Sequence, residues 1–427
     1  MGAQMDEFCH SPKVKSAPPL VNPAAQSHWA VTVLFNGFLL DHIALVGIDR
    51  SGAALRNIAM NRTPQTGSGP SRAERRRAAK LAGKTGAAPA RKPETAANLK
   101  AEIETHYRAG DLPKARRLTE KLLKAQPDDA ATLNFSGMLA QQTGDIDTAI
   151  MRFSAAHSRQ PSASTTKVLA EALRASIHER LNENRTDTVP EKCDRLQSLQ
   201  PHSTEAPAFK AIALLHLGER ALAADALGIE QLVEISDLAA PSGWERIDAF
   251  NTDLAREISS DPSMAVPDEA HPTYHNRHLK ITAPLVIDRP GPVAALTRMI
   301  EETVAGYRAQ REGLSHSFLS HWPQSSKLEA WGTLLEGEGT VDSHIHLEGY
   351  LGMVYYPELP PEVSEGQGWL ELGRPPDDFP IEVEPITQLI EPKPGRLVIF
   401  PGYLFHRTTP FKSTHRRISI AYDVVAT

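Results

Sequence analysis

The sequence of 427 residues contains little cysteine, with only Cys9 and Cys193. Two thiols cannot build a disulfide framework or a four-cysteine zinc site. We therefore expect a reducing, cytoplasmic setting, and we expect any metal to be bound by imidazole and carboxylate groups. Histidine is plentiful by comparison, since the chain contains 17 of them.

The chain also lacks a long uninterrupted apolar run. The best candidate for a membrane span, residues 29–48, is interrupted by Asn36 and Asp41, and a charge in the middle of a bilayer is costly. The same stretch has neither the basic start nor the small-residue cleavage site of a signal peptide. A net charge of −6 provides no general attraction to nucleic acid. We expect a soluble protein without a membrane or nucleic-acid partner.

Large apolar residues are scarce from Arg62 to Asn98. Residues 71–92 hold eight Lys or Arg against one Glu, and such a segment cannot bury enough apolar surface to offset its chain entropy. We predict that residues 1–95 form a disordered basic leader. Because the run from Met60 resembles the basic leaders of bacterial reading frames, we also hypothesise that translation starts at Met60 and that residues 1–59 lie upstream.

A repeat runs through residues 96–235, which are rich in helix-forming side chains. Three small or turn-forming residues recur at one constant spacing: Gly110 as Gly144, Ala115 as Ala149, and Pro127 as Pro161. A period of about 34 residues is typical of tetratricopeptide repeats, in which Gly ends a helix, Ala lets two helices approach and Pro closes the unit. Weaker units follow from Thr165 and around Gly218, while residues 182–207 interrupt the period.

The repeats predict an α-helical solenoid, and they leave two roles open. One is a groove that binds a peptide or protein partner. The other is a helical spacer that packs on the next domain or dimerises.

From residue 240 to residue 427 the pattern changes from helical to strand-forming. A helical pattern is clear at residues 293–307, and short apolar runs bounded by Gly and Pro then take over. These runs are residues 352–356, 381–383, 396–400 and 418–425. Many short strands with turn residues between them favour a β-sandwich or barrel. The predicted fold is therefore α-helical first and β-rich after it.

Chemistry-bearing side chains gather within the β-rich part. On an extended strand, residues two apart point to one face, so His344, His346 and Glu348 would project together. His406 stands much later in the sequence, and Arg417 follows it after roughly the length of one strand. Ser419 shares the strand face of Arg417.

This order of residues suits one kind of metal chemistry. Non-heme Fe(II) oxygenases bind iron through two His and one carboxylate on one side of the metal, which leaves the other positions open. A co-substrate with a carboxylate tail needs a fixed bidentate cation, which Arg supplies better than Lys. A hydroxyl such as that of Ser419 completes the binding site.

Residues 250–422 resemble the family of 2-oxoglutarate/Fe(II)-dependent oxygenases, prolyl-hydroxylase-like proteins that often follow tetratricopeptide repeats. The matching pieces are Phe250-Asn251, Leu254, Ile258, Trp331, Gly339, His344-x-His346, residues 352–356, residues 394–401, His406 and residues 417–420. The resemblance implies a double-stranded β-helix, or jelly roll, with flanking helices over residues 240–427. It also implies Fe(II) and 2-oxoglutarate as cofactors.

The resemblance implies roles for individual residues. The expected metal ligands are His344, His346 and His406, and no catalytic residue is expected beyond the metal centre. The expected 2-oxoglutarate ligands are Arg417, Ser419 and Tyr355. The family usually has Pro and small residues after the second His, where this chain has Leu347-Glu348-Gly349. An alternative register therefore stays open, in which Glu348 replaces His344 or His346.

We expect a dioxygenase that hydroxylates a substrate while O2 converts 2-oxoglutarate to succinate. The repeats suggest a protein or peptide substrate, whose identity the sequence does not reveal. The rivals are a non-catalytic scaffold with a degenerate β-domain, a cupin-like metal enzyme without 2-oxoglutarate, and a zinc hydrolase with three His ligands. A second metal site at His271, His275 and His278 is not favoured, because no Cys or carboxylate completes it.

Overall fold

The computed structural model describes residues 95–267, 278–361 and 366–427. These residues all belong to one unit, Pro89–Thr427. The predicted leader before Thr95, the proposed start at Met60, and His271 and His275 lie outside the described residues. Within the described part of the chain, no helix combines the length and the apolar character that a membrane crossing would require.

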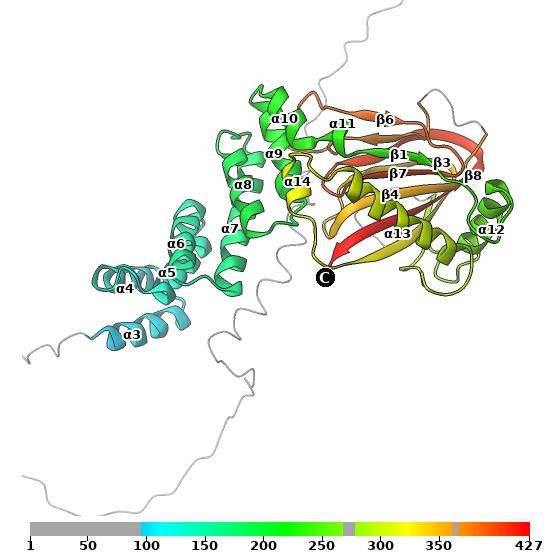
Figure 1. Cartoon of the computed structure of the whole chain (residues 1–427). Coiled ribbons are helices and arrows are strands. Elements are labelled where there is room, and N and C mark those ends of the chain that lie inside the picture. The colour runs from blue at the N-terminus through cyan, green and yellow to red at the C-terminus, as the bar shows by residue number, and fades with distance from the viewer. Residues whose placement is uncertain (1–94, 268–277, 362–365) are drawn as a thin grey trace, which may run out of the picture. The chain divides into compact units, whose positions relative to one another are not determined.

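The first part of the described chain is a series of helices, of which each packs against the next (Figure 1). Their bounds are α3 (Ala96–Arg108), α4 (Leu112–Ala125), α5 (Ala130–Gln142), α6 (Ile146–Arg159), α7 (Ala163–Asn182), α8 (Val189–Leu199), α9 (Glu205–His216), α10 (Arg220–Leu227) and α11 (Ile229–Leu232). Helix α5 follows α3, and α6 follows α4, at the same offset that separates Gly110 from Gly144. The repeat period of the sequence is therefore also the spacing of helix pairs.

The repeated small residues explain how one helix pair is made. Gly144 has a φ of 77°, a left-handed conformation that lets the chain turn between α5 and α6. The next residue, Asp145, accepts a hydrogen bond from the Thr148 backbone nitrogen and so caps α6. Gly137 allows α5 to approach α6, since a Cβ there would lie 2.6 Å from the ring of Phe153.

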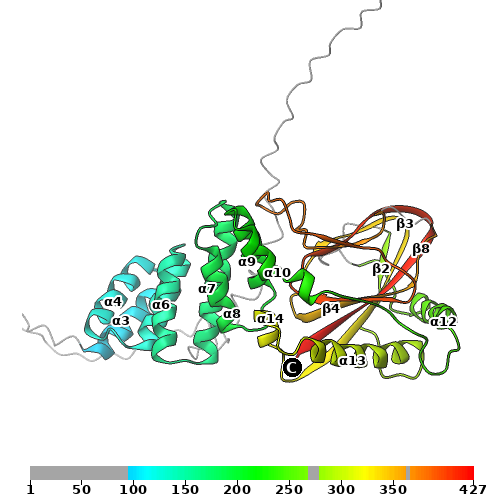
Figure 2. The same ribbon diagram turned by 45° about the horizontal axis from the view of Figure 1, so that its top comes forward.

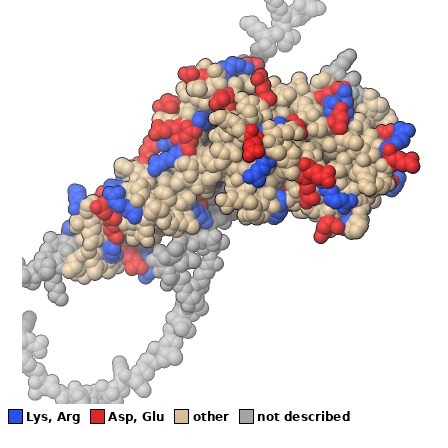
Figure 3. Space-filling view, viewed as in Figure 1, with Lys and Arg blue, Asp and Glu red and all other residues tan. Residues whose placement is uncertain are grey.

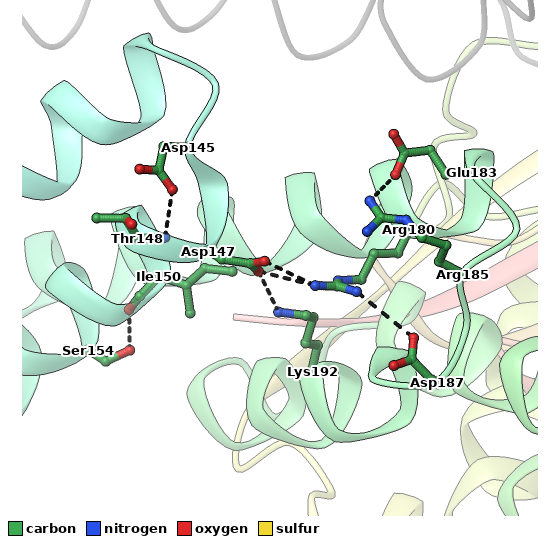
Figure 4. Close-up of polar contacts among 10 residues, drawn as sticks. All are labelled: Asp145, Asp147, Thr148, Ile150, Ser154, Arg180, Glu183, Arg185, Asp187 and Lys192. Atoms are coloured by element: carbon green, nitrogen blue, oxygen red, sulfur yellow. Dashed lines mark hydrogen bonds and ion pairs between the residues drawn. The ribbon is translucent and has the colours of Figure 1, made fainter.

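Ion pairs connect the next helices (Figure 4). Asp147 on α6 accepts hydrogen bonds from Arg180 on α7 at 3.1 Å and from Lys192 on α8 at 3.4 Å. The predicted interruption at residues 182–207 contains helix α8, so it is no break in helical structure. The period is lost because α7 has 20 residues, whereas α5, the first helix of the preceding pair, has 13.

The second part is an antiparallel β-sheet with helices. The strands are β1 (Glu234–Asp237), β2 (Leu279–Ile281), β3 (Ser326–His344), β4 (Gly349–Glu358), β5 (Leu370–Leu372), β6 (Gln388–Ile390), β7 (Arg396–Pro401) and β8 (His406–Ala426). Their order is β1-β7-β4-β8-β3-β2, and β5 pairs with both β6 and the start of β8. The helices are α12 (Ile247–Ser259), α13 (Pro292–Gln310) and α14 (Ser317–Ser320).

Helices α12 and α13 lie along the outside of the curved sheet (Figure 2). The ring of Tyr355 on β4 contacts that of Phe250 on α12, with centroids 6.4 Å apart. The hydroxyl of Tyr422 on β8 lies 3.0 Å from that of Thr297 on α13. Because side chains alternate along a strand, the residues next to Tyr355 and Tyr422 point to the inner face of the sheet.

The helices and the sheet share one core. Buried apolar side chains form a continuous cluster from α5 to β8. Phe209 on α9 contacts Phe379 with ring centroids 6.0 Å apart, and Arg220 on α10 donates to the Glu384 carbonyl at 3.0 Å. Helices α9 and α10 therefore pack against the segment that connects β5 and β6. Acidic and basic side chains are interspersed on the face shown in Figure 3.

The expected order, a helical region followed by an antiparallel β-rich domain, is confirmed. The predicted helix at 293–307 lies within α13, and the predicted strands at 352–356, 396–400 and 418–425 lie within β4, β7 and β8. The predicted strand at 381–383 is wrong.

That segment belongs to no strand, because Pro380 and Pro385 flank it and cannot donate to a strand partner. Strand β1 also begins earlier than expected, since Glu234 already pairs with Ile399 of β7. The sheet therefore takes its first strand from the end of the segment expected to be helical.

Candidate metal centre

Three histidines meet where β3 ends and β8 begins. His344 is the last residue of β3 and is the register partner of His406, the first residue of β8. His346 follows two residues after β3 ends. The ring centroids are 4.2 Å apart for His344 and His406, 4.8 Å for His346 and His406, and 5.5 Å for His344 and His346. One ligand nitrogen from each ring lies within 4.8 Å of the others, so the group could hold a metal ion.

Each ring is oriented through its Nδ1 atom. His344 Nδ1 lies 2.8 Å from the Asp342 carbonyl oxygen, and His406 Nδ1 lies 3.0 Å from the carbonyl oxygen of Leu404. His346 Nδ1 contacts Asp423 Oδ1. Because these oxygens only accept, each Nδ1 donates a hydrogen and each neutral ring carries its lone pair on Nε2. Metal-binding histidines are typically held in this way.

The environment of His406 favours the neutral ring that a metal needs. Burial, followed by the neighbouring His344 and His346, holds the pKa of His406 well below its usual range. A metal ligand must be deprotonated, so proton competition at this ring is weak near neutral pH. Phe400 on β7 packs against the His406 ring, with the two ring centroids 4.7 Å apart.

Arg417 is a buried cation on the inner face of β8. Its side chain is almost inaccessible, with 2% of the residue exposed, and its Nη1 donates to Ser419 Oγ at 3.1 Å. Its guanidinium carbon lies 5.2 Å from the ring centroid of Tyr356. Among the described residues no carboxylate pairs with Arg417, and its Nε atom makes no hydrogen bond. Burial lowers the pKa of this guanidinium. A buried cation without a counter-ion is costly, and an anionic ligand would remove that cost.

The hydroxyl group of Ser419 links the guanidinium of Arg417 to the hydroxyl group of Thr333. Ser419 Oγ lies 2.6 Å from the hydroxyl of Thr333, its register partner on β3. Thr333 was not expected at the site, because the sequence alone does not show which strand pairs with β8. Arg417, Ser419 and Thr333 together present donors that suit a carboxylate.

The structure places Tyr355 away from this group. Its hydroxyl donates to Asn251 Oδ1 on α12 at 2.6 Å, on the outer face of the sheet. Tyr356 is the tyrosine on the inner face, next to Arg417, and its hydroxyl makes no hydrogen bond among the described residues. Burial raises the pKa of Tyr356 to about 12. The expected partnership of Tyr355 with Arg417 is therefore not observed.

Glu348 is also outside the cluster. It is exposed, and it is not among the three residues whose ligand atoms come together. The chain turns away after His346, and Thr204 of the helical region donates to the Leu347 carbonyl at 3.4 Å. The structure thus brings together His344, His346 and His406 and leaves Glu348 apart.

Asp423 belongs to the site but was not anticipated. It contacts His346, and both side chains are nearly buried, with 9% and 8% of their surface exposed. The alternation that puts Arg417 and Ser419 on one face continues to Ala421 and Asp423, so the signal was present in the sequence. The same face therefore carries the contact to His346 and the buried cation.

The three histidines and Arg417 lie within a segment that matches a protein-family model. Residues 329–423 match the family model described as "Putative 2OG-Fe(II) oxygenase". The match contains the three histidines, Arg417, Ser419 and Asp423. This segment is therefore similar to oxygenases that depend on Fe(II) and 2-oxoglutarate. Helices α3 to α11 lie outside the matched residues. A comparison with curated proteins finds no match to the chain.

Several solved structures are similar in part. A prolyl-4-hydroxylase from Pseudomonas putida is 14% identical, with a TM-score of 0.32, covering 47% of this chain and 95% of that one. A prolyl hydroxylase from Trichoplax adhaerens, in complex with a hypoxia inducible factor peptide fragment, is 15% identical, with a TM-score of 0.32 and coverage of 49% and 91%. HygX from Streptomyces hygroscopicus, with nickel and 2-oxoglutarate bound, is 12% identical, with a TM-score of 0.32 and coverage of 48% and 86%.

Proposed function

We propose that this protein is an Fe(II)/2-oxoglutarate-dependent dioxygenase in which His344, His346 and His406 hold the iron. One observation carries the proposal: a buried arginine, for which the described residues offer no carboxylate partner, lies on the strand face that also contacts the histidine cluster. Three oriented imidazoles suit a divalent metal, and the buried cation suits the far carboxylate of a keto acid. The family match of residues 329–423 supports the same assignment.

The residues around Arg417 would bind 2-oxoglutarate. The far carboxylate would accept hydrogen bonds from Arg417 and Ser419, and Thr333 would orient the Ser419 hydroxyl. Because Tyr355 bonds to α12, we transfer its expected helper role to Tyr356. When bound, Fe(II) and 2-oxoglutarate supply O2-dependent hydroxylation of a substrate coupled to the formation of succinate.

The protein's own contribution is to hold the ligands and to limit water. The backbone carbonyls of Asp342 and Leu404 orient two of the rings, and the low pKa of His406 keeps that ring neutral. Phe400 and Trp331 flank the histidines; the Trp331 ring centroid lies 5.7 Å from that of His346. Apolar walls of this kind lower the local dielectric and strengthen the polar contacts inside.

We further propose that the helices are tetratricopeptide-like repeats and that the sheet domain is a jelly roll. The equal offsets from α3 to α5 and from α4 to α6 support the repeat assignment. The proposed division is a leader over 1–95, repeats over 96–235 and an oxygenase domain over 240–427. Strand β1 bridges the last two, because Glu234 pairs with the sheet. A peptide or protein partner would bind along the repeat helices.

Anaerobic titration tests the function. Fe(II) should bind to the purified protein at one equivalent, and 2-oxoglutarate added next should produce a metal-to-ligand charge-transfer band. His406→Ala should lose metal binding, whereas His415→Ala, an exposed histidine of the same strand, should keep it. If neither metal nor 2-oxoglutarate binds and no succinate forms in air, the domain is a scaffold. If metal binds and 2-oxoglutarate does not, a zinc hydrolase or cupin-like enzyme replaces this proposal.

A further inference from the structure

Resting on the proposed function, we propose that Asp423 is a positioning residue for the metal centre. Acting through His346, it supplies the negative charge that a carboxylate ligand provides in the usual two-histidine, one-carboxylate site. The carboxylate would not bind the metal itself.

The three rings differ in the group that accepts a hydrogen bond from Nδ1. His344 and His406 donate from Nδ1 to neutral backbone carbonyl oxygens. The Nδ1 atom of His346 instead donates to an ionisable side chain, and that contact with Asp423 is almost fully buried. A hydrogen bond to a carboxylate makes the opposite ring nitrogen a stronger donor to a metal, and it does so most effectively where water is excluded.

The sheet holds Asp423 rigidly in place. Its strand, β8, runs between β3 and β4, and Asp423 has Glu329 and Gly352 as register partners on the two sides. Gly349 leaves room for the carboxylate, since a Cβ at that position would lie 2.5 Å from Asp423 Oδ2. The sheet therefore presents a fixed anion to one ring of the cluster, in a space that a larger residue at 349 would fill.

The net charge of the site depends on its ligand set. Two neutral imidazoles and one carboxylate reduce the charge of a divalent metal site to +1, whereas three neutral imidazoles leave it at +2. Among the residues that the structure describes, no carboxylate belongs to the cluster of ligand atoms, and Glu348 is exposed. Asp423 supplies this negative charge through its hydrogen bond with His346 Nδ1. This explains how a three-histidine cluster can serve an iron chemistry that usually employs a carboxylate ligand.

The test is the affinity of the full chain for Co(II) alone, measured by visible absorption under competition with a chelator. Asp423→Asn retains an acceptor oxygen of the same size for His346 Nδ1 but removes the charge. The dissociation constant for Co(II) should rise 10- to 100-fold, as expected for loss of an outer-sphere partner, with a shifted Co(II) spectrum. The melting temperature of the metal-free protein should stay close to that of the wild type. Asp377→Asn, the same change at an exposed carboxylate of the sheet domain, should alter neither quantity.

Two further variants separate positioning from simple structural support. Gly349→Ala should also weaken Co(II) binding, because it displaces the carboxylate without removing it. In a His346→Ala background, in which two ligands remain and weak Co(II) binding is titrated directly without the chelator, Asp423→Asn should cause no additional loss of affinity, because the ring through which it acts is gone.

Wild-type affinity and spectrum in Asp423→Asn would overturn the proposal, and so would an equal loss of affinity with and without His346. Co(II) binding that depends on Asp423, but without any 2-oxoglutarate binding, would contradict the dioxygenase function and leave the role of Asp423 standing. A wild-type protein that binds no Co(II) would contradict both.

Discussion

His344 and His406 are register partners across the antiparallel pair β3–β8, and their ring centroids lie 4.2 Å apart. The two residues are far apart in sequence, yet each stands at the end of a strand that the sheet holds in place. The candidate metal centre therefore lies at the end of the β3–β8 strand pair. Changes at the residues around this pair should affect metal binding, co-substrate binding and stability separately.

Replacing Arg417 should separate keto-acid binding from metal binding. Arg417→Ala should raise the dissociation constant for 2-oxoglutarate by about 10- to 100-fold, because charge-assisted hydrogen bonds contribute roughly 1.5–3 kcal/mol. Arg417→Lys should restore part of the affinity, since it keeps the charge but loses the planar fork. Calorimetric titration under anaerobic conditions with Mn(II) present measures both.

The neighbouring Arg416 provides the matched control. It is exposed and pairs with Glu358 at 2.7 Å, so Arg416→Ala should leave 2-oxoglutarate affinity unchanged. Unchanged affinity in Arg417→Ala would show that the buried guanidinium has another role.

The two adjacent tyrosines should respond in opposite ways. Tyr355→Phe removes the hydrogen bond to Asn251, so the free energy of unfolding should fall by about 1 kcal/mol while 2-oxoglutarate affinity stays unchanged. Tyr356→Phe removes a buried hydroxyl that forms no hydrogen bond to any described residue, so stability should be kept while 2-oxoglutarate affinity falls several-fold. Urea denaturation and calorimetry on the same two variants decide the matter. The reverse pattern would return the ligand-binding role to Tyr355.

The pH dependence of stability should reveal His406. Its pKa in the folded, metal-free protein lies well below the ordinary value of about 6.5 that applies when the chain is unfolded. Between these two values the unfolded state binds more protons, so the free energy of unfolding should fall as pH drops below about 6.5. The slope from one such group is at most about 1.4 kcal/mol per pH unit.

Urea denaturation of the metal-free protein between pH 5 and pH 7.5 measures that slope. The variant His406→Gln should show a shallower slope than the wild type. Equal slopes would mean that His406 titrates as an ordinary histidine does.

The helices should tolerate glycine replacement only where there is space for the added Cβ. Gly137→Ala should lower the free energy of unfolding by about 1–3 kcal/mol, because its Cβ would meet the buried ring of Phe153 at 2.6 Å. Gly306→Ala, within α13 and with no atom within 4 Å of the new Cβ, should instead stabilise by about 0.5–1 kcal/mol. Neither change should affect metal binding. Equal effects at the two positions would contradict the close approach of α5 and α6.

The sequence predicted much of this arrangement from three simple rules. The repeat period predicted paired helices, and the structure contains them at that offset. The two-residue alternation of strands put Arg417 and Ser419 on one face, and they share a hydrogen bond. The chemistry of imidazole singled out His344, His346 and His406, and the structure brings these three rings together.

The remainder depended on tertiary packing, which no local rule contains. Tyr355 and Tyr356 are identical residues on opposite faces, and only the position of α12 shows that Tyr355 points outward. Thr333 joins the site because β3 pairs with β8 in one particular register. Glu348 shares the alternation of His344 and His346, but the chain leaves the strand at His344 and the alternation ends there. The two-residue alternation along β8 would also have placed Asp423 on the face of Arg417 and Ser419.

The most direct test of the account is a crystal structure of the full chain grown anaerobically with Mn(II) and 2-oxoglutarate, with anomalous data collected for manganese. We expect one anomalous peak, from a manganese ion bound by Nε2 of His344, His346 and His406. The far carboxylate of 2-oxoglutarate should be bound by Arg417. Manganese bound by Glu348 in place of one of these histidines, or a keto acid bound away from Arg417, would contradict the account.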